Sequence, residues 1–217
     1  PNLCRLGLDN ILPNTFSDSL DETFAYSARF HEISAGKDTT SGHWELMGAP
    51  LKEAFSHYPN GFPTALLEEW CQLSEIPGFL GNKSASGTDI IAELGEEHVS
   101  SLKPIVYTSS DSVLQIAAHE EAFGLEKLYR ICEKARELTR EQRIGRVIAR
   151  PFLGNSPSTF SRTNNRKDYS LVPPKNILDI LVKNEINTVG VGKISDIFNG
   201  RSLNESYKTN SNHEGVD

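Results

Sequence analysis

The stretch "PPKNILDILVKNEINTVGVGKISDIF", residues 173–198, places a helical pattern directly before a short apolar strand and a turn. A helix that leads into an apolar strand is typical of α/β proteins, in which helices lie outside a parallel sheet. With 217 residues, 37% of them hydrophobic, the chain is long enough to bury a core of this kind. We therefore expect an α/β fold.

The middle of the chain contains shorter units. Residues 64–73 predict a helix with Thr64 as its N-cap, and residues 87–99 predict another that starts at Thr88 or Asp89. The runs "KPIVYT" and "IGRVIARPFLG" predict strands, the second of them ended by Pro151 and Gly154. Four further expectations are two helices within residues 110–139, a polar loop over 155–170, a short helix over 1–8 and a strand-like alternation over 24–30.

The domain organisation follows from changes in composition. Residues 46–63 are rich in Pro and Gly, which indicates a connection to a new unit, and the helix–strand pattern resumes after residue 170. We expect an α/β core made of residues 1–52 and 171–217, interrupted by an insert over residues 53–170. No internal repeat is present.

Charge and cysteine content exclude several classes of protein. A formal net charge of -7 argues against general nucleic-acid binding, and no apolar run approaches the roughly 18 residues of a membrane span. Cys4, Cys71 and Cys132 are odd in number and far apart, which suggests free thiols in the cytoplasm. The chain begins at Pro1, without Met, and ends in "SNHEGVD", so we expect an internal piece of a longer protein.

Three hydroxyl side chains follow one another in "AGKDTTSGHWE", residues 35–45. One interpretation is a nucleophile loop whose small residues and backbone N–H groups allow a phosphate to approach closely. The other is a polar turn capped by Asp38, since hydroxyl clusters are common in loops. The residues alone leave both interpretations open.

The junction "YTSSDSVLQ" has two interpretations as well. We expect a strand to run into a helix here, with Ser109, Ser110 or Asp111 as the helix cap. The same side chains could instead hold sugar hydroxyls.

Cations form a further candidate site in this acidic chain. Arginine suits bidentate phosphate binding, and the alternative for each residue is an ordinary solvated charge. Lys193 follows the apolar "TVGVG", at the end of a core strand where α/β sheets bind ligands. The six histidines are scattered and form no metal-binding pair. The candidate cations are Arg146, Arg150, Arg162, Arg166 and Lys193.

Five blocks, in order, carry a family resemblance. They are "AGKDTTSGHWELMG", "GNKSASGTDIIAELGEEH", "KPIVYTSSDSVLQIAAHEE", "IGRVIARPFLG" and "GVGKISDIFNG". Together they resemble the bacterial phosphopentomutase family of the alkaline-phosphatase superfamily. The resemblance implies a partial alkaline-phosphatase-like core, a parallel sheet flanked by helices, with an inserted α+β cap domain.

The resemblance also implies a reaction and its site. Such enzymes interconvert ribose or deoxyribose 1-phosphate and the 5-phosphate through a phosphothreonine and a sugar bisphosphate. They use two Mn²⁺ ions and a primer such as glucose 1,6-bisphosphate. The phosphorylated threonine, also a metal ligand, corresponds to Thr39. The implied substrate-binding residues are Ser109, Asp111, Val113, Arg146, Ile148, Arg162 and Lys193.

One departure from the family limits what this chain can do alone. Apart from Thr39, the family's metal ligands lie in segments that would precede Pro1 or follow Asp217. We therefore expect an inactive fragment of an enzyme whose partners are small sugar phosphates, with no nucleic acid and no membrane involved. The alternatives are a related phosphohydrolase or phosphoglycerate mutase, or a sugar-phosphate-binding module without catalysis.

Overall fold

A computed structural model describes residues 2–8, 11–12, 25–209, 211 and 213–215. The chain divides into two compact units, residues 1–33 and 34–217. In the first unit, the short helix α1 (Asn2–Arg5) agrees with the sequence prediction. The strand predicted over residues 24–30 is wrong for residues 25–30, which have no regular structure and pair with no strand, while Phe24 lies outside the described residues.

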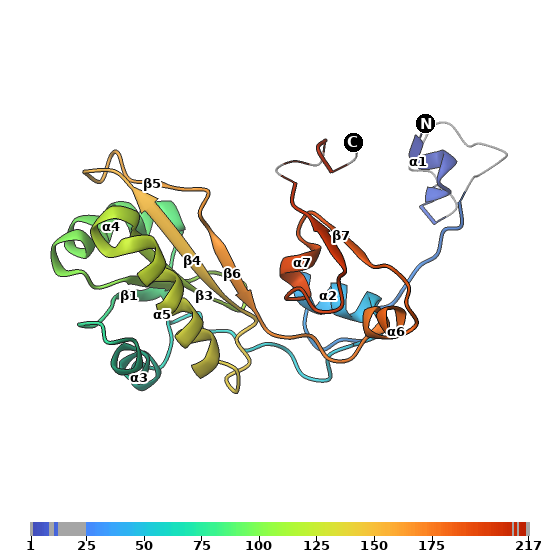
Figure 1. Ribbon diagram of the computed structural model, residues 1–217, viewed down its shortest axis with the longest axis horizontal. Helices are drawn as coiled ribbons and strands as arrows, with labels where there is room; N and C mark the ends of the chain where they lie inside the picture. Colours follow the sequence, from blue (N-terminus) through green and yellow to red (C-terminus); the bar gives the residue numbers. More distant parts are fainter. Residues whose placement is uncertain (1, 9–10, 13–24, 210, 212, 216–217) are drawn as a thin grey trace. The chain divides into compact units, whose positions relative to one another are not determined.

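The second unit is an α/β structure built on a mixed six-stranded sheet (Figure 1). Strands β1 to β4 lie in sequence order, and the short strands β5 and β6 both pair with β4. The β1/β2 and β3/β4 pairs are parallel, and the remaining pairs in this sheet are antiparallel. The strands are β1 (Leu80–Ser84), β2 (Ile105–Thr108), β3 (Val113–His119), β4 (Arg146–Leu153), β5 (Ser161–Arg162) and β6 (Lys167–Ser170).

Helices join these strands, and a smaller sheet follows them. The helices of the second unit are α2 (Thr39–Leu46), α3 (Thr64–Ser74), α4 (Gly87–Ser101), α5 (Leu125–Leu138), α6 (Ile177–Lys183) and α7 (Ile194–Ile197), with a π-helical turn, η2 (Glu120–Gly124), before α5. Strands β7 (Val189–Val191) and β8 (Glu205–Tyr207) form a separate parallel pair. The division into residues 1–52, 53–170 and 171–217 stays a prediction.

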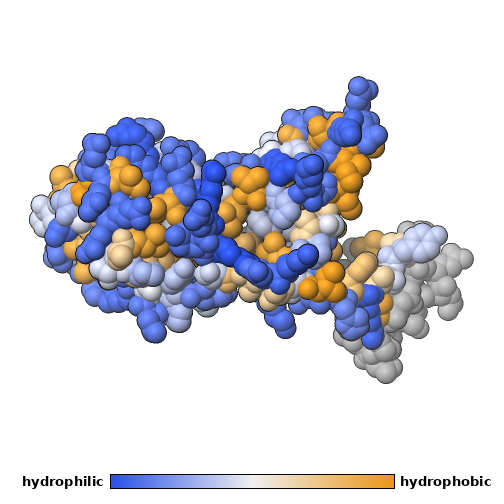
Figure 2. Space-filling model, turned by 90° about the horizontal axis from the view of Figure 1, so that it is seen from below, coloured by the Kyte–Doolittle hydropathy of each residue, from blue (hydrophilic) through white to orange (hydrophobic). Residues whose placement is uncertain are grey.

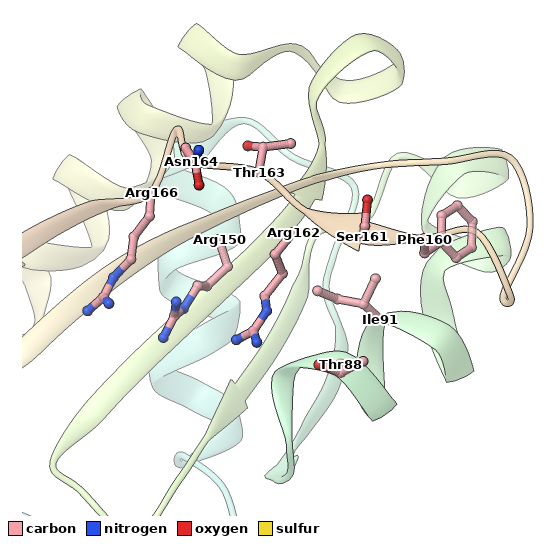
Figure 3. A pocket seen from close by; sticks show the side chains of 9 residues that line it. All are labelled: Thr88, Ile91, Arg150, Phe160, Ser161, Arg162, Thr163, Asn164 and Arg166. Atoms are coloured by element: carbon pink, nitrogen blue, oxygen red, sulfur yellow. The ribbon is translucent and has the colours of Figure 1, made fainter. Parts of the chain in front are cut away.

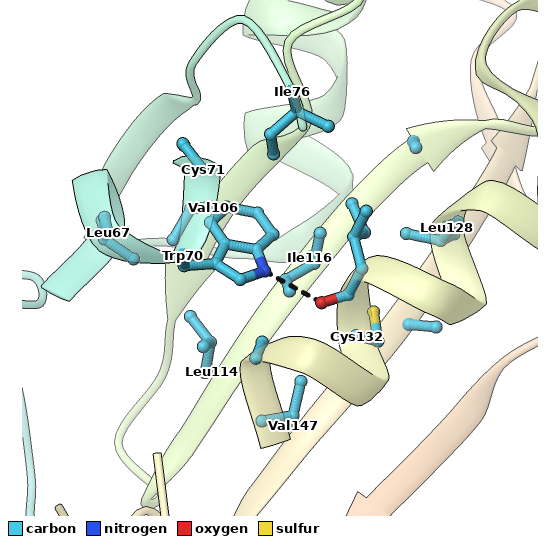
Figure 4. Close-up of a cluster of buried hydrophobic side chains, with 14 of the residues drawn as sticks. Leu67, Trp70, Cys71, Ile76, Val106, Leu114, Ile116, Leu128, Cys132 and Val147 are labelled. Atoms are coloured by element: carbon cyan, nitrogen blue, oxygen red, sulfur yellow. Dashed lines mark hydrogen bonds between the residues drawn. The ribbon is translucent and has the colours of Figure 1, made fainter. Parts of the chain in front are cut away.

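One face of the large sheet packs against α3 and α5. Alternate residues of the central strands, such as Val106, Ile116 and Val147, contact these helices and form the largest buried cluster (Figure 4). Trp70 of α3 lies within it, and its indole N–H donates to the Ile131 carbonyl of α5 at 2.8 Å. Because successive side chains of a strand point to opposite faces of the sheet, these alternate residues all face α3 and α5.

The opposite face is only partly covered by a helix. Ile90 and Ile91 of α4 pack on Tyr107 and Phe152, which form a second buried cluster with their neighbours. Cross-strand register places polar residues on the rest of this face: Gln115, Arg146, Arg150 and Asp168 share it with Ile148. This polar face is one wall of the candidate site.

A third cluster packs α2 against α7. Trp44 and Phe55 meet Ile197 and Phe198, and the Trp44 indole N–H donates to the Ile197 carbonyl at 3.0 Å. The molecular surface mixes hydrophilic and apolar residues (Figure 2), and the exposed apolar side chains of the second unit include Leu46, Ile177, Ile180, Val189 and Val191. No helix in the described residues has both the length and the apolar character needed to cross a bilayer.

Several local predictions are wrong. Residues 113–119 form strand β3 instead of a helix, because they pair with β2 and β4 and are buried on both faces. Residues 109–112 are therefore a turn between antiparallel strands and cap no helix. The predicted loop over 155–170 contains β5 and β6, and β4 continues through Pro151 to Leu153.

The predicted helix caps also differ. Pro63 and Ser86 occupy the N-cap positions of α3 and α4, and neither helix has a side-chain cap. Thr64 and Gly87 are instead the first helical residues. The helices themselves, like strands β2, β4 and β7 and helix α6, agree with the prediction.

Candidate functional site

Thr39 is the first residue of α2, and Asp38 caps this helix. The Asp38 carboxylate accepts hydrogen bonds from the Thr40 and Ser41 backbone N–H groups at 2.9 and 3.0 Å, and the Ser41 hydroxyl also donates to it. Thr40 and Ser41 are buried, whereas Thr39 is exposed. The capped turn is therefore present, and it leaves one of the three hydroxyls accessible.

The exposed Thr39 borders a cavity of about 470 Å³ that is rich in cations. Five cationic side chains face two carboxylates in its lining, so the cavity favours an anionic ligand. Helix α2 adds the partial positive charge of its N-terminus at the same place. The lining residues are Thr39, Arg146, Arg166, Lys167, Asp168, Ser170, Lys193, Asp196, Ile197 and Lys208.

Asp168 organises the wall that the large sheet contributes. Its side chain is 8% exposed and accepts two hydrogen bonds from Arg166, both at 2.6 Å, and one from Arg146 at 3.2 Å. Arg146 also approaches Asp111 at 3.8 Å. Because a carboxylate between two guanidinium groups offsets their mutual repulsion, Asp168 can hold both arginines in fixed orientations.

The opposite wall comes from the small parallel sheet. Lys193 and Lys208 follow the carboxyl ends of β7 and β8, and Gly192, with a φ of 66°, makes the turn that brings Lys193 there. This is the edge at which parallel sheets commonly bind ligands. Burial raises the pKa of Asp196, and the nearby Asp168 raises it further.

Comparison with known proteins identifies the chain's relatives. It is 50% identical over 218 residues to a phosphopentomutase of Symbiobacterium thermophilum, a match that covers 100% of this chain and 56% of the relative. A phosphopentomutase of Clostridium novyi is 52% identical over 219 residues, with the same coverage, and one of Idiomarina loihiensis is 49% identical over 217 residues. Over nearly its whole length, the chain is about half identical in sequence to these phosphopentomutases. It spans 54–56% of the length of these three curated relatives, and no family model matches it.

The structure brings together some of the residues implied by the phosphopentomutase resemblance. Thr39, Arg146 and Lys193 line the same cavity, and Asp111 approaches it through its ion pair with Arg146. Ser109 lies half-buried in the turn before β3, next to Asp111. The roles of these residues as nucleophile and substrate ligands stay predictions.

Other implied residues lie apart from this cavity. Val113 and Ile148 share the polar sheet face with Arg146, but they are only 3% and 2% exposed. Arg162 lines a second cavity with Arg150 and Arg166. Among the residues that line the first cavity, six were not predicted, because no local pattern shows which strands will pair: Lys167, Asp168, Ser170, Asp196, Ile197 and Lys208.

The metal site expected for a phosphopentomutase does not fit the described residues. Within this part of the chain, no group of three or more His, Cys, Asp or Glu side chains could hold a metal ion. Near Thr39, the Asp38 carboxylate is engaged by the start of α2, and Asp168 is engaged by two arginines. The described side chains near Thr39 therefore do not complete a metal site.

Proposed function

We propose that this chain is part of a phosphopentomutase that interconverts the 1- and 5-phosphates of ribose or deoxyribose. Thr39 serves as the phosphate carrier. The observation that carries the proposal is the exposed Thr39 hydroxyl at the start of α2, inside a cavity with five cations. The names of relatives about half identical in sequence support the same activity.

In the proposed reaction, a phosphorylated Thr39 donates its phosphoryl group to the free hydroxyl of a pentose monophosphate. The Thr39 Oγ–P bond breaks, a bond from the sugar oxygen to phosphorus forms, and the proton of the sugar hydroxyl passes to Thr39 Oγ. The sugar bisphosphate then turns and returns its other phosphoryl group to Thr39. Arg146, Lys193 and Lys208 stabilise the charge that spreads over the transferred oxygens.

The proposal assigns different parts of the chain to a cap and to a core. Residues 53–170 form a cap, and residues 1–52 and 171–217 form part of the core. Ser109, Asp111, Val113, Arg146, Ile148 and Arg162 act from the cap side, and Lys193 acts from the core side. Two Mn²⁺ ions, with Thr39 as one ligand, and a bisphosphate activator such as glucose 1,6-bisphosphate belong to the proposal, with the other ligands supplied outside the described residues.

The chain is shorter than its relatives, and this difference in length affects whether it can be active alone. Because it covers about 56% of their length, we propose that turnover requires the remaining length and that the 217-residue chain alone is inactive. Phosphopentomutase activity of the isolated chain, assayed with Mn²⁺ and glucose 1,6-bisphosphate, would contradict this.

Peptide mass spectrometry tests the assignment of Thr39. A polypeptide of the relatives' full length that contains this sequence is incubated with glucose 1,6-bisphosphate, and the peptide over residues 37–52 is analysed. We expect phosphate on Thr39 in the parent and no phosphate on this peptide in Thr39→Val. The kcat of that variant should fall by about a thousand-fold or more, because the reaction loses its nucleophile. Thr39→Ser, which keeps a hydroxyl, is the matched control.

Two results would favour the alternatives. Persistent absence of phosphate on Thr39, together with affinity for ribose 5-phosphate, would favour a binding module without catalysis. Turnover of 2-phosphoglycerate in preference to ribose 5-phosphate would favour a phosphoglycerate mutase relative.

A further inference from the structure

The connection between β5 and β6, residues 163–166, carries one of the cations of the Thr39 cavity. Figure 3 shows the Arg166 side chain extending to the same side of the strands as those of Arg150 and Arg162. Its guanidinium group donates twice to Asp168, at 2.6 Å, yet the side chain is 41% exposed. Because a long side chain on a short exposed connection can adopt many conformations, the position of this charge depends on how the connection is held.

Glu120, the first residue of η2, holds one end of this connection. Its Oε1 accepts hydrogen bonds from the Thr163 hydroxyl and from the Asn165 side-chain amide, the latter at 3.0 Å. The Thr163 backbone N–H also donates to the Pro151 carbonyl of β4 at 3.0 Å. Thr163 is therefore tied both to the sheet and to η2, three residues before Arg166.

Tyr129 of α5 holds the two residues next to Arg166. Its hydroxyl donates to the Asn165 carbonyl at 2.7 Å. Burial raises the pKa of Tyr129, and the nearby Glu120 raises it further, so the phenol keeps its proton and remains a donor at neutral pH. On the other side of Arg166, the Lys167 ammonium lies 5.1 Å from the centre of the Tyr129 ring, which attracts the cation.

These contacts leave Arg166 held on both sides while its own side chain reaches the cavity. Residues 165 and 167 are attached to η2 and α5, and the Arg166 guanidinium group is fixed by Asp168. The same carboxylate accepts from Arg146 at 3.2 Å, so the position of Arg166 also affects a second cation of the cavity. An arginine that is already held in place loses less conformational freedom when it binds an anion.

We propose that Glu120 and Tyr129 are positioning residues that hold Arg166 in place to bind the substrate phosphate in the Thr39 cavity. Neither residue lines that cavity, so both act through Arg166. This role rests on the proposed function, because it takes the Thr39 cavity as the phosphate site. It adds two residues of η2 and α5 that strengthen binding without touching the ligand.

Binding of orthophosphate to the 217-residue chain at low ionic strength tests this role, with the Kd read from the amide NMR signals of Thr39 and Thr40. Arg166→Met should raise the Kd by about ten-fold or more, because a charge-assisted hydrogen bond is lost. Glu120→Ala should raise it by about three-fold or more, because Arg166 must then be ordered on binding. Tyr129→Phe, which removes only the hydroxyl, should also weaken binding.

Glu120→Gln and Glu121→Ala are the matched controls. Glu120→Gln loses the same charge as Glu120→Ala but keeps an acceptor oxygen, so it should bind phosphate within about two-fold of the parent. Glu121→Ala changes the next, exposed residue of η2 and should not weaken binding. Because loss of a negative charge by itself favours an anion, weaker binding by Glu120→Ala cannot come from the charge.

A double-mutant cycle separates positioning from a general structural role. If Glu120 acts through Arg166, then Glu120→Ala in the Arg166→Met background should change the Kd by less than about two-fold. A general loosening of this part of the sheet would instead weaken binding by the same factor in both backgrounds. The Tm of each variant shows that the compared proteins are folded.

The positioning role is overturned by any of three results. These are a folded Glu120→Ala variant that binds orthophosphate as the parent does, additive effects of Glu120→Ala and Arg166→Met, and Thr39 and Thr40 signals that do not shift with phosphate. Phosphate on Thr39 together with additive effects would keep the proposed function and reject the positioning role. Coupled effects without phosphate on Thr39 would keep the positioning role and reject Thr39 as the phosphate carrier.

Discussion

His98 is fully buried where α4 meets the large sheet, and both of its ring nitrogens are engaged. Nδ1 lies 2.7 Å from the Lys103 carbonyl oxygen, which can only accept, and Nε2 accepts from the His119 backbone N–H at 2.8 Å. The ring also packs against Phe123 and Phe152. These partners fix one neutral tautomer, because a proton on Nε2 would face another donor.

This arrangement predicts a loss of stability in mild acid. Burial lowers the pKa of His98 below its ordinary value of 6.5. The unfolded chain therefore takes up a proton more readily than the folded chain. The contribution to the free energy of unfolding is fully present above about pH 6.5 and is lost as the pH falls toward the lower folded pKa.

Urea unfolding at pH 7.5 and pH 5.5 measures the effect. His98→Asn should unfold with a free energy about 1–3 kcal/mol lower at pH 7.5, because a buried partner of the His119 N–H is lost. It should also show a smaller pH dependence than the parent. His57→Asn, at an exposed position, should keep the parent's pH dependence, and equal slopes for all three proteins would contradict the role of His98.

At the scale of elements, α2 is a short helix whose start depends on one side chain. Asp38→Ala removes the acceptor for two backbone N–H groups, so we expect the free energy of unfolding to fall by about 1 kcal/mol. Urea unfolding of the 217-residue chain measures the change. Asp38→Asn retains an acceptor oxygen and should recover most of the stability, and Lys37→Ala, next to it, should have little effect.

The elements also show what local sequence can predict. Helix α5 and strand β4 could be identified because Leu128 and Ile131 follow helical spacing and the short apolar run 147–149 includes the β-branched Val147 and Ile148. Strand β3 could not, because "VLQIAAH" is buried along its whole length and such a run lacks the alternation that marks a strand. Its neighbours in the sheet, not its own pattern, determine its conformation.

Some residues of the candidate site could likewise be predicted from the sequence, and others could not. Lys193 could be placed at a strand end from its local pattern, and the resemblance pointed to Thr39 and Arg146. Asp168 could not be anticipated, because its contact with Arg146 depends on the antiparallel register of β6 with β4. That register arises from a turn between strands that sequence spacing does not reveal.

At the scale of the whole molecule, the three large buried clusters all lie within residues 34–217. We therefore expect a chain that begins at Ser34 to fold and to unfold with a Tm within about 3 °C of that of the 217-residue chain, since its apolar cores are retained. Differential scanning calorimetry of the two chains provides the measurement. A substantially lower Tm for the shorter chain would show that residues 1–33 contribute to the stability of the larger unit.

Strand β4 has a further consequence for how this protein can vary. Arg146 and Arg150 line the two cavities, while Val147 and Ala149 face the core on α5. A substitution at one position alters one contact, but inserting or deleting a single residue would exchange the two sets and bury the guanidinium groups. We therefore expect insertions and deletions to be tolerated in flanking turns, such as residues 154–160, and not within β4.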